Sequence, residues 1–354
     1  MKINKNFWKG KKIFLTGHTG FKGSWFVILL NMLGAKVYGY SLRAEKKSLF
    51  QLAGIKRLTE NSILGDIRNF SKLKKSIKSS NPDFIVHMAA QPLVKTSYLK
   101  TKYTYEVNAI GTLNILEVLN QLNKIKKALI ITTDKIYENN GKKIFYKESD
   151  RLGGDDPYSN SKACAELIVK SYNESFFKKK NIQIATARAG NVIGGGDYSL
   201  YRIIPDYFRA FFSKKKLIIR NPDFVRPWQH VIEPLYGYLL ILQKLKNNKY
   251  YKENNWNFGP KKNNNKTVLE IINLLNAKFN NPVKVFKKNK KNNHYETKNL
   301  MLNSSKAEKY LSWNSKLNIS QSLDLVADWY KNTKNKKNYL NVCKMQIKSY
   351  FNYL

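Results

Sequence analysis

The stretch IFLTGHTGFKG, which covers residues 13–23, decides the fold class of this chain. Its first four residues are apolar or β-branched and predict a short strand. The glycines that follow permit a tight turn and let backbone amides approach a pyrophosphate at the positive end of a helix. Their spacing is G-x-x-G-x-x-G, so the motif takes its meaning from its place after the first strand of an α/β pattern. We therefore expect a nicotinamide dinucleotide to bind at Gly17, Thr19, Gly20, Phe21, Lys22 and Gly23.

Outward from this stretch, short apolar runs alternate with helical segments, as in a parallel sheet covered on both faces. The helix after the glycines is predicted to run from about Gly23 to Leu33 and to end at Gly34. Further strands are predicted over residues 37–42, 62–64, 83–87, 128–132 and 182–187, with a helix over 158–177. A long helix precedes the strand at 128, and its predicted apolar stripe is Val107, Ile110, Leu113 and Leu116. These elements predict an α/β fold of the Rossmann type, with a doubly wound parallel sheet.

The alternation loosens beyond residue 190, where Gly194-Gly195-Gly196 and Pro205 interrupt the pattern. The later predicted elements are helices over 233–246, 267–279 and 320–331, a strand over 256–258 and a solvated loop over 287–294. We predict a dinucleotide-binding domain over 1–190, which includes the helix at 158–177. A smaller, mainly substrate-binding α/β domain is predicted over 191–335, followed by a C-terminal extension over 336–354.

The net charge of the 354 residues is +40, from 64 lysines and arginines against 24 acidic residues. Nucleic-acid binding through phosphate neutralisation is one interpretation of this charge. We favour a compositional bias that fills solvated positions with lysine, because the lysines are spread along the chain and no nucleic-acid motif accompanies them.

Other sequence features argue against a membrane protein or a metalloprotein. The longest largely apolar stretch, residues 25–33, has about half the length that a membrane span requires. The apolar run near the N-terminus breaks at the glycine-rich turn, so it is no secretory segment, and we expect a cytoplasmic protein. Two cysteines and four scattered histidines predict neither a disulfide framework nor a metal site.

The residues predicted to face the adenosine half of the cofactor do not identify the cofactor as NAD or NADP. The second strand ends without the acid that normally binds the ribose hydroxyl. Arg43 follows it and faces either the 2′-phosphate of NADP or solvent, so the choice between NAD and NADP stays open. Asp66, followed by Ile67, either accepts a hydrogen bond from the adenine or caps the next helix. Asn108 lies on the apolar side of the long helix, where a polar side chain needs a partner.

Tyr158 and Lys162 form the sharpest chemical signal in the chain. Residues at i and i+4 lie one above the other on a helix face. A free phenol has a pKa of about 10, and a nearby ammonium favours the phenolate, so the pair suits general-base catalysis. A plain surface pair is the alternative. Thr133, Asp134 and Lys135 follow the strand at 128–132, at the edge where open α/β sheets bind ligands, and Thr133 can bond the same substrate hydroxyl as Tyr158.

Together these residues resemble the extended short-chain dehydrogenase/reductase family, whose members act on sugar nucleotides. The matching stretches are LTGHTGFKGSW (15–25), HMAAQP (87–92), TTDKIY (132–137), DPYSNSK (156–162), ARAGNVIGGGD (187–197) and RPWQHV (226–231). The likeness spans roughly residues 7–332. The lysine after Thr-Asp and the RPWQHV run resemble the branch of CDP-glucose 4,6-dehydratases.

The resemblance implies a hydro-lyase that binds NAD, takes CDP-glucose as its substrate and forms a homo-oligomer, a dimer or a tetramer. Its product would serve deoxysugar synthesis for surface polysaccharides such as the lipopolysaccharide O-antigen. The resemblance also implies cofactor contacts for Ala89, Ala90 and Asn108, and substrate contacts for Gln91, Asn191, Arg226 and His230. For Asn191 and Arg226 an ordinary surface or structural role is the alternative.

The implied reaction cycle assigns roles to the remaining residues. Tyr158, with Lys162 and Thr133, deprotonates the C4 hydroxyl as hydride leaves C4. Asp134 then acts as an acid and assists loss of the C6 hydroxyl. In the last step hydride returns to C6. Related dehydratases carry glutamate where this chain has Lys135, so Lys135 is a base at C5, a stabiliser of the enolate or only a partner of Asp134. The competing functions are an epimerase or another dehydratase of the same family, and a basic nucleic-acid-binding protein on a Rossmann fold.

Overall fold

The computed structural model describes residues 3–122, 124–139, 141, 144–245, 254–261, 264–287, 299–333 and 338–352. In this part of the chain the largest sheet has seven parallel strands in the order β3-β2-β1-β4-β5-β7-β12. They are β1 (Lys12–Thr16), β2 (Lys36–Ser41), β3 (Asn61–Leu64), β4 (Phe84–His87), β5 (Lys127–Ile131), β7 (Gln183–Ala189) and β12 (Asn255–Phe258). The strand order reverses between β1 and β4, which is where doubly wound sheets bind ligands. The predicted fold class is confirmed.

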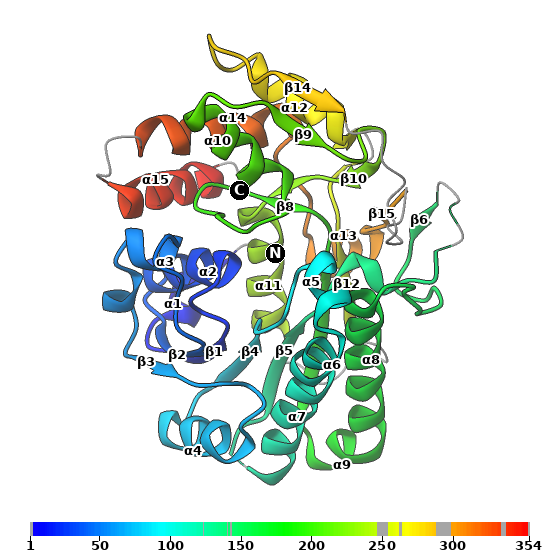
Figure 1. Cartoon of the computed structure of the whole chain (residues 1–354). Helices are drawn as coiled ribbons and strands as arrows, with labels where there is room; N and C mark the ends of the chain where they lie inside the picture. Colours follow the sequence, from blue (N-terminus) through cyan, green and yellow to red (C-terminus); the bar gives the residue numbers. More distant parts are fainter. Residues whose placement is uncertain are drawn as a thin grey trace.

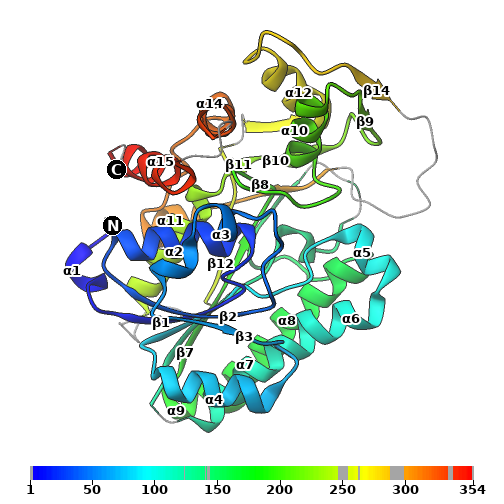
Figure 2. The same cartoon turned by 60° about the vertical axis from the view of Figure 1, so that its left-hand side comes forward.

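Both faces of this sheet are buried, and alternate residues of a strand enter different cores. In β1, Ile13 and Leu15 pack into the core on one face, whereas Phe14 packs into the core on the other. Helices α2 (Phe21–Met32) and α11 (Ile232–Lys244) cover the first face; α4 (Phe70–Ser80), α7 (Gly111–Gln121) and α8 (Pro157–Tyr172) cover the second. Figure 2 shows the strands between these two groups of helices.

The long helix before β5 departs from its predicted apolar stripe. It consists of α6 (Thr101–Tyr105), a π-helical segment η2 (Glu106–Ile110) and α7. The wider turn of a π-helix shifts the phase of the residues that follow. Val107 and Leu116 are buried as predicted, but Ile110 is 46% exposed, so the prediction for Ile110 is wrong. Leu113 is half-buried.

The remaining predicted elements agree with the observed ones apart from their ends. Helix α2 begins at Phe21, and Gly34 follows it with a φ of +78°, as a C-terminal glycine should. The short elements around the sheet are α1 (Lys5–Trp8), α3 (Leu49–Leu52), η1 (Ile55–Leu58), α5 (Val94–Leu99), η3 (Asp134–Ile136), η4 (Asn173–Phe177) and α9 (Lys178–Lys180). Across the described ranges, no helix has both the length and the apolar character needed to cross a membrane.

Beyond β7 the chain builds a smaller layer at the carboxyl edge of the sheet (Figure 1). Its helices are α10 (Ile203–Ser213), α12 (Val268–Asn276), α13 (Ser305–Leu311) and α14 (Ile319–Asn332). Its strand pairs are β8 (Val192–Ile193) with β11 (Gln229–His230), β9 (Leu217–Ile219) with β14 (Val285–Lys287), and β10 (Val225–Pro227) with β13 (Asn265–Thr267). A further strand, β15 (Met301–Leu302), pairs with β6 (Phe145–Tyr146), which precedes β7 in the chain.

The second half of the chain also contributes to the large sheet. The strand predicted at 256–258 is β12, which pairs with β7, and α11 packs on the same sheet. The division of the chain into 1–190, 191–335 and 336–354 stays a prediction. Except for Lys287, the loop predicted at 287–294 lies outside the described residues.

The C-terminal helix α15 (Tyr339–Asn352) is tied to the core through a buried carboxylate. Glu233 on α11 accepts hydrogen bonds from the backbone amides of Lys316 (2.8 Å) and Leu317 (2.7 Å). It also accepts one from the hydroxyl of Tyr350 on α15 (2.8 Å). Burial raises the pKa of Glu233 to about 7, although these hydrogen bonds act in the opposite direction.

Replacement of Glu233 by glutamine should remove a pH dependence of stability. The pKa of this carboxyl is 4.5 in its ordinary environment and about 7 in the folded protein. Its contribution to stability is therefore complete below about pH 4.5 and is lost as the pH rises through about 7. We expect the wild type to lose stability relative to Glu233→Gln over this window, measured by denaturant unfolding. If the difference in the free energy of unfolding between the wild type and Glu233→Gln stays constant across this pH window, the raised pKa of Glu233 is contradicted.

Candidate active site

The loop between β1 and α2 has a backbone that suits a pyrophosphate. Gly17 has a φ of +76°, and a Cβ atom there would lie 2.7 Å from the amide nitrogen of Ala89. A Cβ atom on Gly23 would lie 2.2 Å from the carbonyl oxygen of Gly17. Gly20 is the N-cap of α2 and supplies no side-chain cap, so the first turn presents its backbone N–H groups. Gly17 and Gly23 thus make the turn at residues 17–23 a close-packed cradle. Contact of the predicted residues of this turn with the cofactor stays a prediction.

The end of β2 and the end of β3 lie beside this cradle. Thr19 Oγ1 lies 2.7 Å from Ser41 Oγ, and Arg43 is exposed. Asp66 does not cap the next helix, because Asn69 does so and the Asp66 carboxylate accepts from Nη2 (2.8 Å) and Nε (3.1 Å) of Arg68. The capping alternative is therefore wrong. Hydrogen bonding from Arg68 lowers the pKa of Asp66.

The loop after β4 is held by two buried polar side chains. Thr16 Oγ1 accepts hydrogen bonds from the amides of Met88 and Ala89, both at 3.1 Å, and Ala89 lies against Gly17 of the glycine loop. Contact of Ala89 and Ala90 with the cofactor stays a prediction. Asn108 accepts from the amide of Gln91 (2.9 Å) and donates to its carbonyl (3.1 Å) and to Ser161 Oγ on α8 (2.9 Å).

These contacts give Asn108 the structural partners that its buried position requires. The side chain of Gln91 donates in turn to Thr104 Oγ1 (3.0 Å) and accepts from the amide of Leu93 (2.8 Å). Ile67 is buried against Gly111, where a Cβ atom would lie 2.7 Å from its side chain. Contact of Ile67 and Asn108 with the cofactor, and of Gln91 with the substrate, stays a prediction.

Helix α8 carries Tyr158 and Lys162 on one buried face. Asp156 caps the helix by accepting from the amide of Ser159 (3.0 Å), and Pro157 occupies its first turn. The ammonium group of Lys162 donates to the carbonyl of Ile131 at the end of β5 (2.8 Å). The surface-pair alternative is therefore wrong, because both side chains point into the protein.

Burial controls the proton affinities of this pair. It raises the pKa of Tyr158 to about 12, and the hydrogen bond with Thr133 acts in the opposite direction. Burial also lowers the pKa of Lys162 to about 8. The predicted lowering of the Tyr158 pKa is therefore wrong for the protein alone, because desolvation by burial is the largest effect on this phenol. A phenolate at neutral pH requires a further positive charge beside Tyr158.

The turn after β5 places a buried acid beside Tyr158. Thr133 donates a hydrogen bond to Oδ1 of Asp134 (3.0 Å), and Asp134 is 1% exposed. Its Oδ2 has no hydrogen-bond partner among the described residues. Burial raises the pKa of Asp134, whereas the charges of Lys135 and Arg226 and the bond from Thr133 lower it. A buried carboxyl with a raised pKa and one oxygen outside any hydrogen bond with the described residues suits the role of a proton donor.

Lys22 joins the same cluster from the first turn of α2. Its Nζ lies 3.4 Å from the hydroxyl of Tyr238 on α11. Burial and the charges of Arg202 and Lys162 lower the pKa of Lys22 to about 7, and the charge of Asp134 raises it. Lys22 is therefore a buried lysine whose proton affinity responds to the other charges of this cluster.

The predicted substrate residues lie in different surroundings. Arg226 on β10 is buried, and its Nη1 donates a hydrogen bond to the carbonyl of Val225 (2.8 Å). Its positive charge lowers the pKa of Asp134. His230 is fully buried against Trp25, with ring centroids 5.7 Å apart, and burial lowers its pKa to about 3. Asn191 is half-buried, and its carbonyl accepts from the amide of Gln229 (3.1 Å). Their substrate roles stay predictions.

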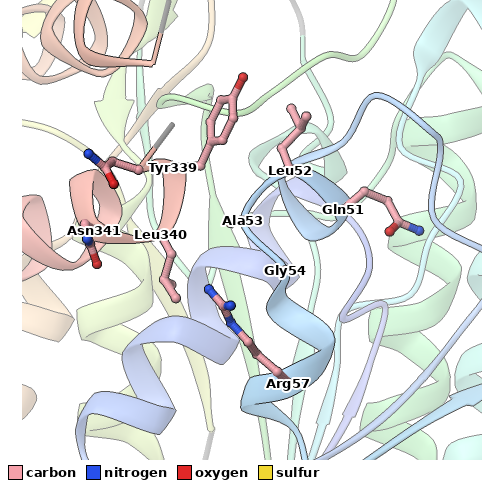
Figure 3. Close-up of a pocket in the computed structure, with 9 residues that line it drawn as sticks. Gln51, Leu52, Ala53, Gly54, Arg57, Tyr339, Leu340 and Asn341 are labelled. Atoms are coloured by element: carbon pink, nitrogen blue, oxygen red, sulfur yellow. The ribbon is translucent and has the colours of Figure 1, made fainter. Parts of the chain in front are cut away.

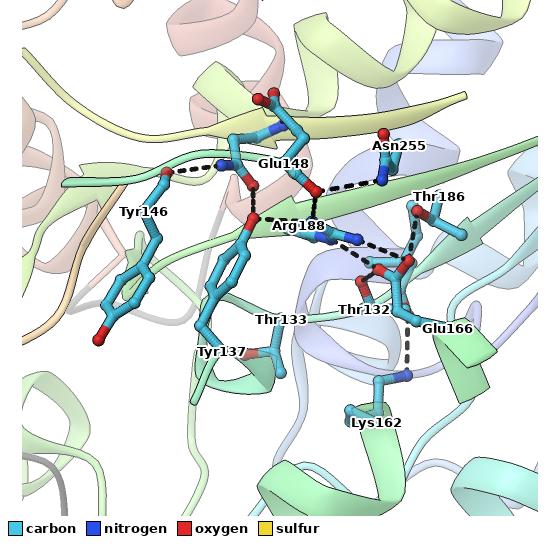
Figure 4. A network of polar contacts seen from close by, with 12 residues as sticks. Thr132, Thr133, Tyr137, Tyr146, Glu148, Lys162, Glu166, Thr186, Arg188 and Asn255 are labelled. Atoms are coloured by element: carbon cyan, nitrogen blue, oxygen red, sulfur yellow. Dashed lines mark hydrogen bonds and ion pairs between the residues drawn. The ribbon is translucent and has the colours of Figure 1, made fainter. Parts of the chain in front are cut away.

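Sequence reasoning missed a buried ion pair between Glu166 on α8 and Arg188 on β7, shown in Figure 4. Two signals could have found it. Glu166 follows Lys162 by four residues, so it shares the face of α8 that carries Tyr158 and Lys162. Arg188 directly follows the strand predicted at 182–187, where a charge beside buried residues needs a partner.

A separate pocket lies between the α3–η1 segment and the start of α15 (Figure 3). Its lining residues are Gln51, Leu52, Ala53, Gly54, Arg57, Asn338, Tyr339, Leu340 and Asn341. None of these belongs to the cluster around Tyr158 and Asp134 or to the glycine-rich cradle.

Comparison with solved structures supports the fold. A dTDP-glucose 4,6-dehydratase from Bacillus anthracis, in complex with NAD, has a TM-score of 0.76 at 24% identity over 94% of this chain and 100% of that one. A UDP-glucuronic acid 4-epimerase from Bacillus cereus, in complex with UDP-glucuronic acid and NAD, has a TM-score of 0.76 at 23% identity, over 91% and 99% of the two chains.

Sequence comparison identifies the family. A CDP-glucose 4,6-dehydratase from Salmonella typhimurium is 42% identical over 354 residues, which cover 98% of both chains. A dTDP-D-glucose 4,6-dehydratase from Homo sapiens is 26% identical over 68% of both chains. The family model described as GDP-mannose 4,6 dehydratase matches residues 14–326. The chain therefore belongs to the GDP-mannose 4,6-dehydratase family of the extended short-chain dehydrogenases/reductases.

Proposed function

We propose that this protein is a CDP-glucose 4,6-dehydratase, which converts CDP-D-glucose to CDP-4-keto-6-deoxy-D-glucose and water. The observation that carries the reaction class is the buried acid Asp134 next to Tyr158 and Thr133, because elimination of water needs a proton donor beside the site of oxidation. The 42% identity with the Salmonella enzyme over 98% of both chains supports CDP-glucose as the substrate. An epimerase would have no use for the acid.

The residues around the β1–α2 loop fit NAD. Gly17 forms a cradle that a Cβ atom would fill, and α2 begins without a side-chain cap. When bound, NAD accepts hydride from C4, returns it to C6 and supplies, in its oxidised form, the positive charge that Tyr158 lacks in the protein alone. The NAD complexes of structures that share this fold support the same choice.

The chain's own groups then have distinct tasks in the reaction. Tyr158 takes the proton of the C4 hydroxyl, and Thr133 orients that hydroxyl. The ammonium group of Lys162 is fixed by its hydrogen bond to the carbonyl of Ile131. It supplies a positive charge on the helix face that carries the Tyr158 phenol. Asp134 donates a proton to the departing C6 hydroxyl once the C5 proton has been removed. Lys135 removes that proton or stabilises the enolate, and the effect of its charge on the proposed acid Asp134 supports a role in the same step.

We also infer that the protein is a cytoplasmic homo-oligomer. Its proposed substrate and cofactor are metabolites of the cytoplasm. Ile110 is 46% exposed and Leu167 is 54% exposed, on η2 and α8, which pack against each other. These apolar side chains offer a surface for a second copy of the chain.

The purified protein should dehydrate CDP-glucose with no net change in the redox state of its cofactor. Mass spectrometry of a panel of CDP-, UDP-, GDP- and dTDP-glucose would show loss of water, with the CDP sugar turned over fastest. Faster turnover of another nucleotide would overturn the CDP assignment. Epimerisation without dehydration would overturn the reaction class.

Replacement Tyr158→Phe should reduce turnover by ~10²–10⁴-fold, because it removes the base at the C4 hydroxyl. Tyr105→Phe is a matched control, since it removes a phenol that bonds Asn160 on the same helix (2.9 Å). Turnover and thermal unfolding of both variants would be measured. Near-normal activity of Tyr158→Phe would contradict a catalytic role of Tyr158 and leave the Tyr158–Lys162 pair with a structural role only.

Replacement Lys135→Met should separate oxidation from elimination. If Lys135 acts at C5, the variant still reduces its bound cofactor, but exchange of the C5 hydrogen with heavy water and loss of water nearly stop. Lys147→Met, at an exposed lysine of the following loop, is the control. Unimpaired C5 exchange in Lys135→Met would exclude both catalytic roles and leave the pairing with Asp134.

A further inference from the structure

Glu166 and Arg188 form a bidentate ion pair inside the protein (Figure 4). Nε of Arg188 lies 2.9 Å from Oε1 of Glu166, and Nη2 lies 3.0 Å from Oε2. Both side chains are buried. Burial raises the pKa of Glu166, but the charge and hydrogen bonds of Arg188 and two threonine hydroxyls outweigh it, so the pKa is lowered overall. The carboxylate is therefore charged at neutral pH.

The carboxylate of this pair holds the beginning of the loop that carries the proposed chemistry. Thr132 Oγ1 donates to Oε1 of Glu166 at 2.5 Å, and Thr132 directly precedes Thr133 and Asp134. Thr186 donates to the other oxygen, Oε2, at 2.8 Å. Thr186 lies on strand β7, so its bond attaches the carboxylate to the sheet and not to the loop.

The guanidinium of the pair holds the end of the same loop. Nη1 of Arg188 donates to the hydroxyl of Tyr137 (2.8 Å) and to the carbonyl of Glu148 (3.2 Å). The hydroxyl of Tyr137 donates onward to Oδ1 of Asn257 on β12 (2.7 Å). Its ring stacks on Tyr146 with centroids 4.9 Å apart. The loop 133–136 is thus attached to one ion pair at both of its ends.

Stability does not account for the presence of such a pair. Well-packed apolar residues of similar volume are often as stabilising as a buried ion pair, or more so, because burial of two charges carries a large desolvation cost. A bidentate pair differs from apolar packing in being directional. It therefore defines where Thr132 and Tyr137 lie with respect to α8.

We propose that Glu166, Arg188, Thr132 and Tyr137 form a positioning clamp that aligns Asp134 and Lys135 with Tyr158 on α8. The clamp touches no reacting atom, and its proposed effect rests on the proposed dehydratase function. Because Tyr158 and Lys162 lie on the rigid helix, whereas Asp134 and Lys135 lie on the clamped loop, loosening the clamp should impair elimination more than oxidation at C4.

The test compares two isosteric threonine variants of the full-length protein with CDP-glucose. Thr132→Val and Thr186→Val each remove one hydroxyl bond to Glu166, but only Thr132 belongs to the loop. Both keep the ion pair, unlike a change of Glu166, which would leave Arg188 buried without its partner. Tyr137→Phe tests the other end of the loop. Dehydration kcat and KM, thermal unfolding and the near-ultraviolet absorbance of bound reduced nicotinamide would be measured for each variant.

The clamp predicts a specific pattern among these variants. Thr132→Val and Tyr137→Phe should lower kcat by about tenfold or more, since a displacement of ~1 Å can cost ~10²-fold, with KM changed less than about twofold. Reduced cofactor should accumulate in both during turnover. Thr186→Val should stay within about twofold of the wild type in kcat. Equal effects of the two threonine variants, or a normal kcat for Thr132→Val, would overturn the clamp. Failure of the wild type to dehydrate CDP-glucose would instead overturn the proposed function.

Discussion

The close approach of the β1–α2 loop to the loop after β4 is the constraint on which the rest of the site depends. At Gly17 the two backbones pack so tightly that a Cβ atom would overlap Ala89. Thr16 bonds the amides of the second loop from the end of β1. This contact lies at the point where the strand order reverses, and the first turn of α2 that follows it carries Lys22 to the cluster around Asp134. A larger residue at position 17 would separate all of these parts.

Desolvation, more than pairing of charges, determines the proton affinities of the groups that gather there. Burial raises the pKa values of Tyr158 and Asp134 and lowers those of Lys162 and Lys22. Each change favours the neutral form of the group. In the protein alone, burial thus increases the proton affinity of the Asp134 carboxyl and makes the Tyr158 phenol harder to ionise. Both fit a reaction in which the base acts only while an oxidised nicotinamide is bound.

Directional hydrogen bonds join the parts of the site more than apolar contact does. Lys162 reaches the carbonyl of Ile131, Asn108 joins the loop after β4 to α8, and the Glu166–Arg188 pair joins α8 to β7 and to the turn after β5. The hydrophobic effect that drives apolar packing on the two faces of the sheet is non-directional. Hydrogen bonds with defined geometry restrict such shifts at the carboxyl edge, where proton transfers need heavy atoms within hydrogen-bond reach.

Four features could be predicted from the sequence: the α/β class, the glycine loop, the Tyr158–Lys162 helix and the placement of Thr133 and Asp134 at a strand end. These features follow from local periodicity and spacing, which act over a few residues of backbone. Long-range packing, in contrast, turns Ile110 outward, brings Arg68 to Asp66, raises the pKa of Tyr158 and pairs Arg188 with Glu166. A π-helical turn changes the phase of a helix, and desolvation and ion pairing depend on groups brought together from distant positions. Neither effect can be read from the spacing of neighbouring residues.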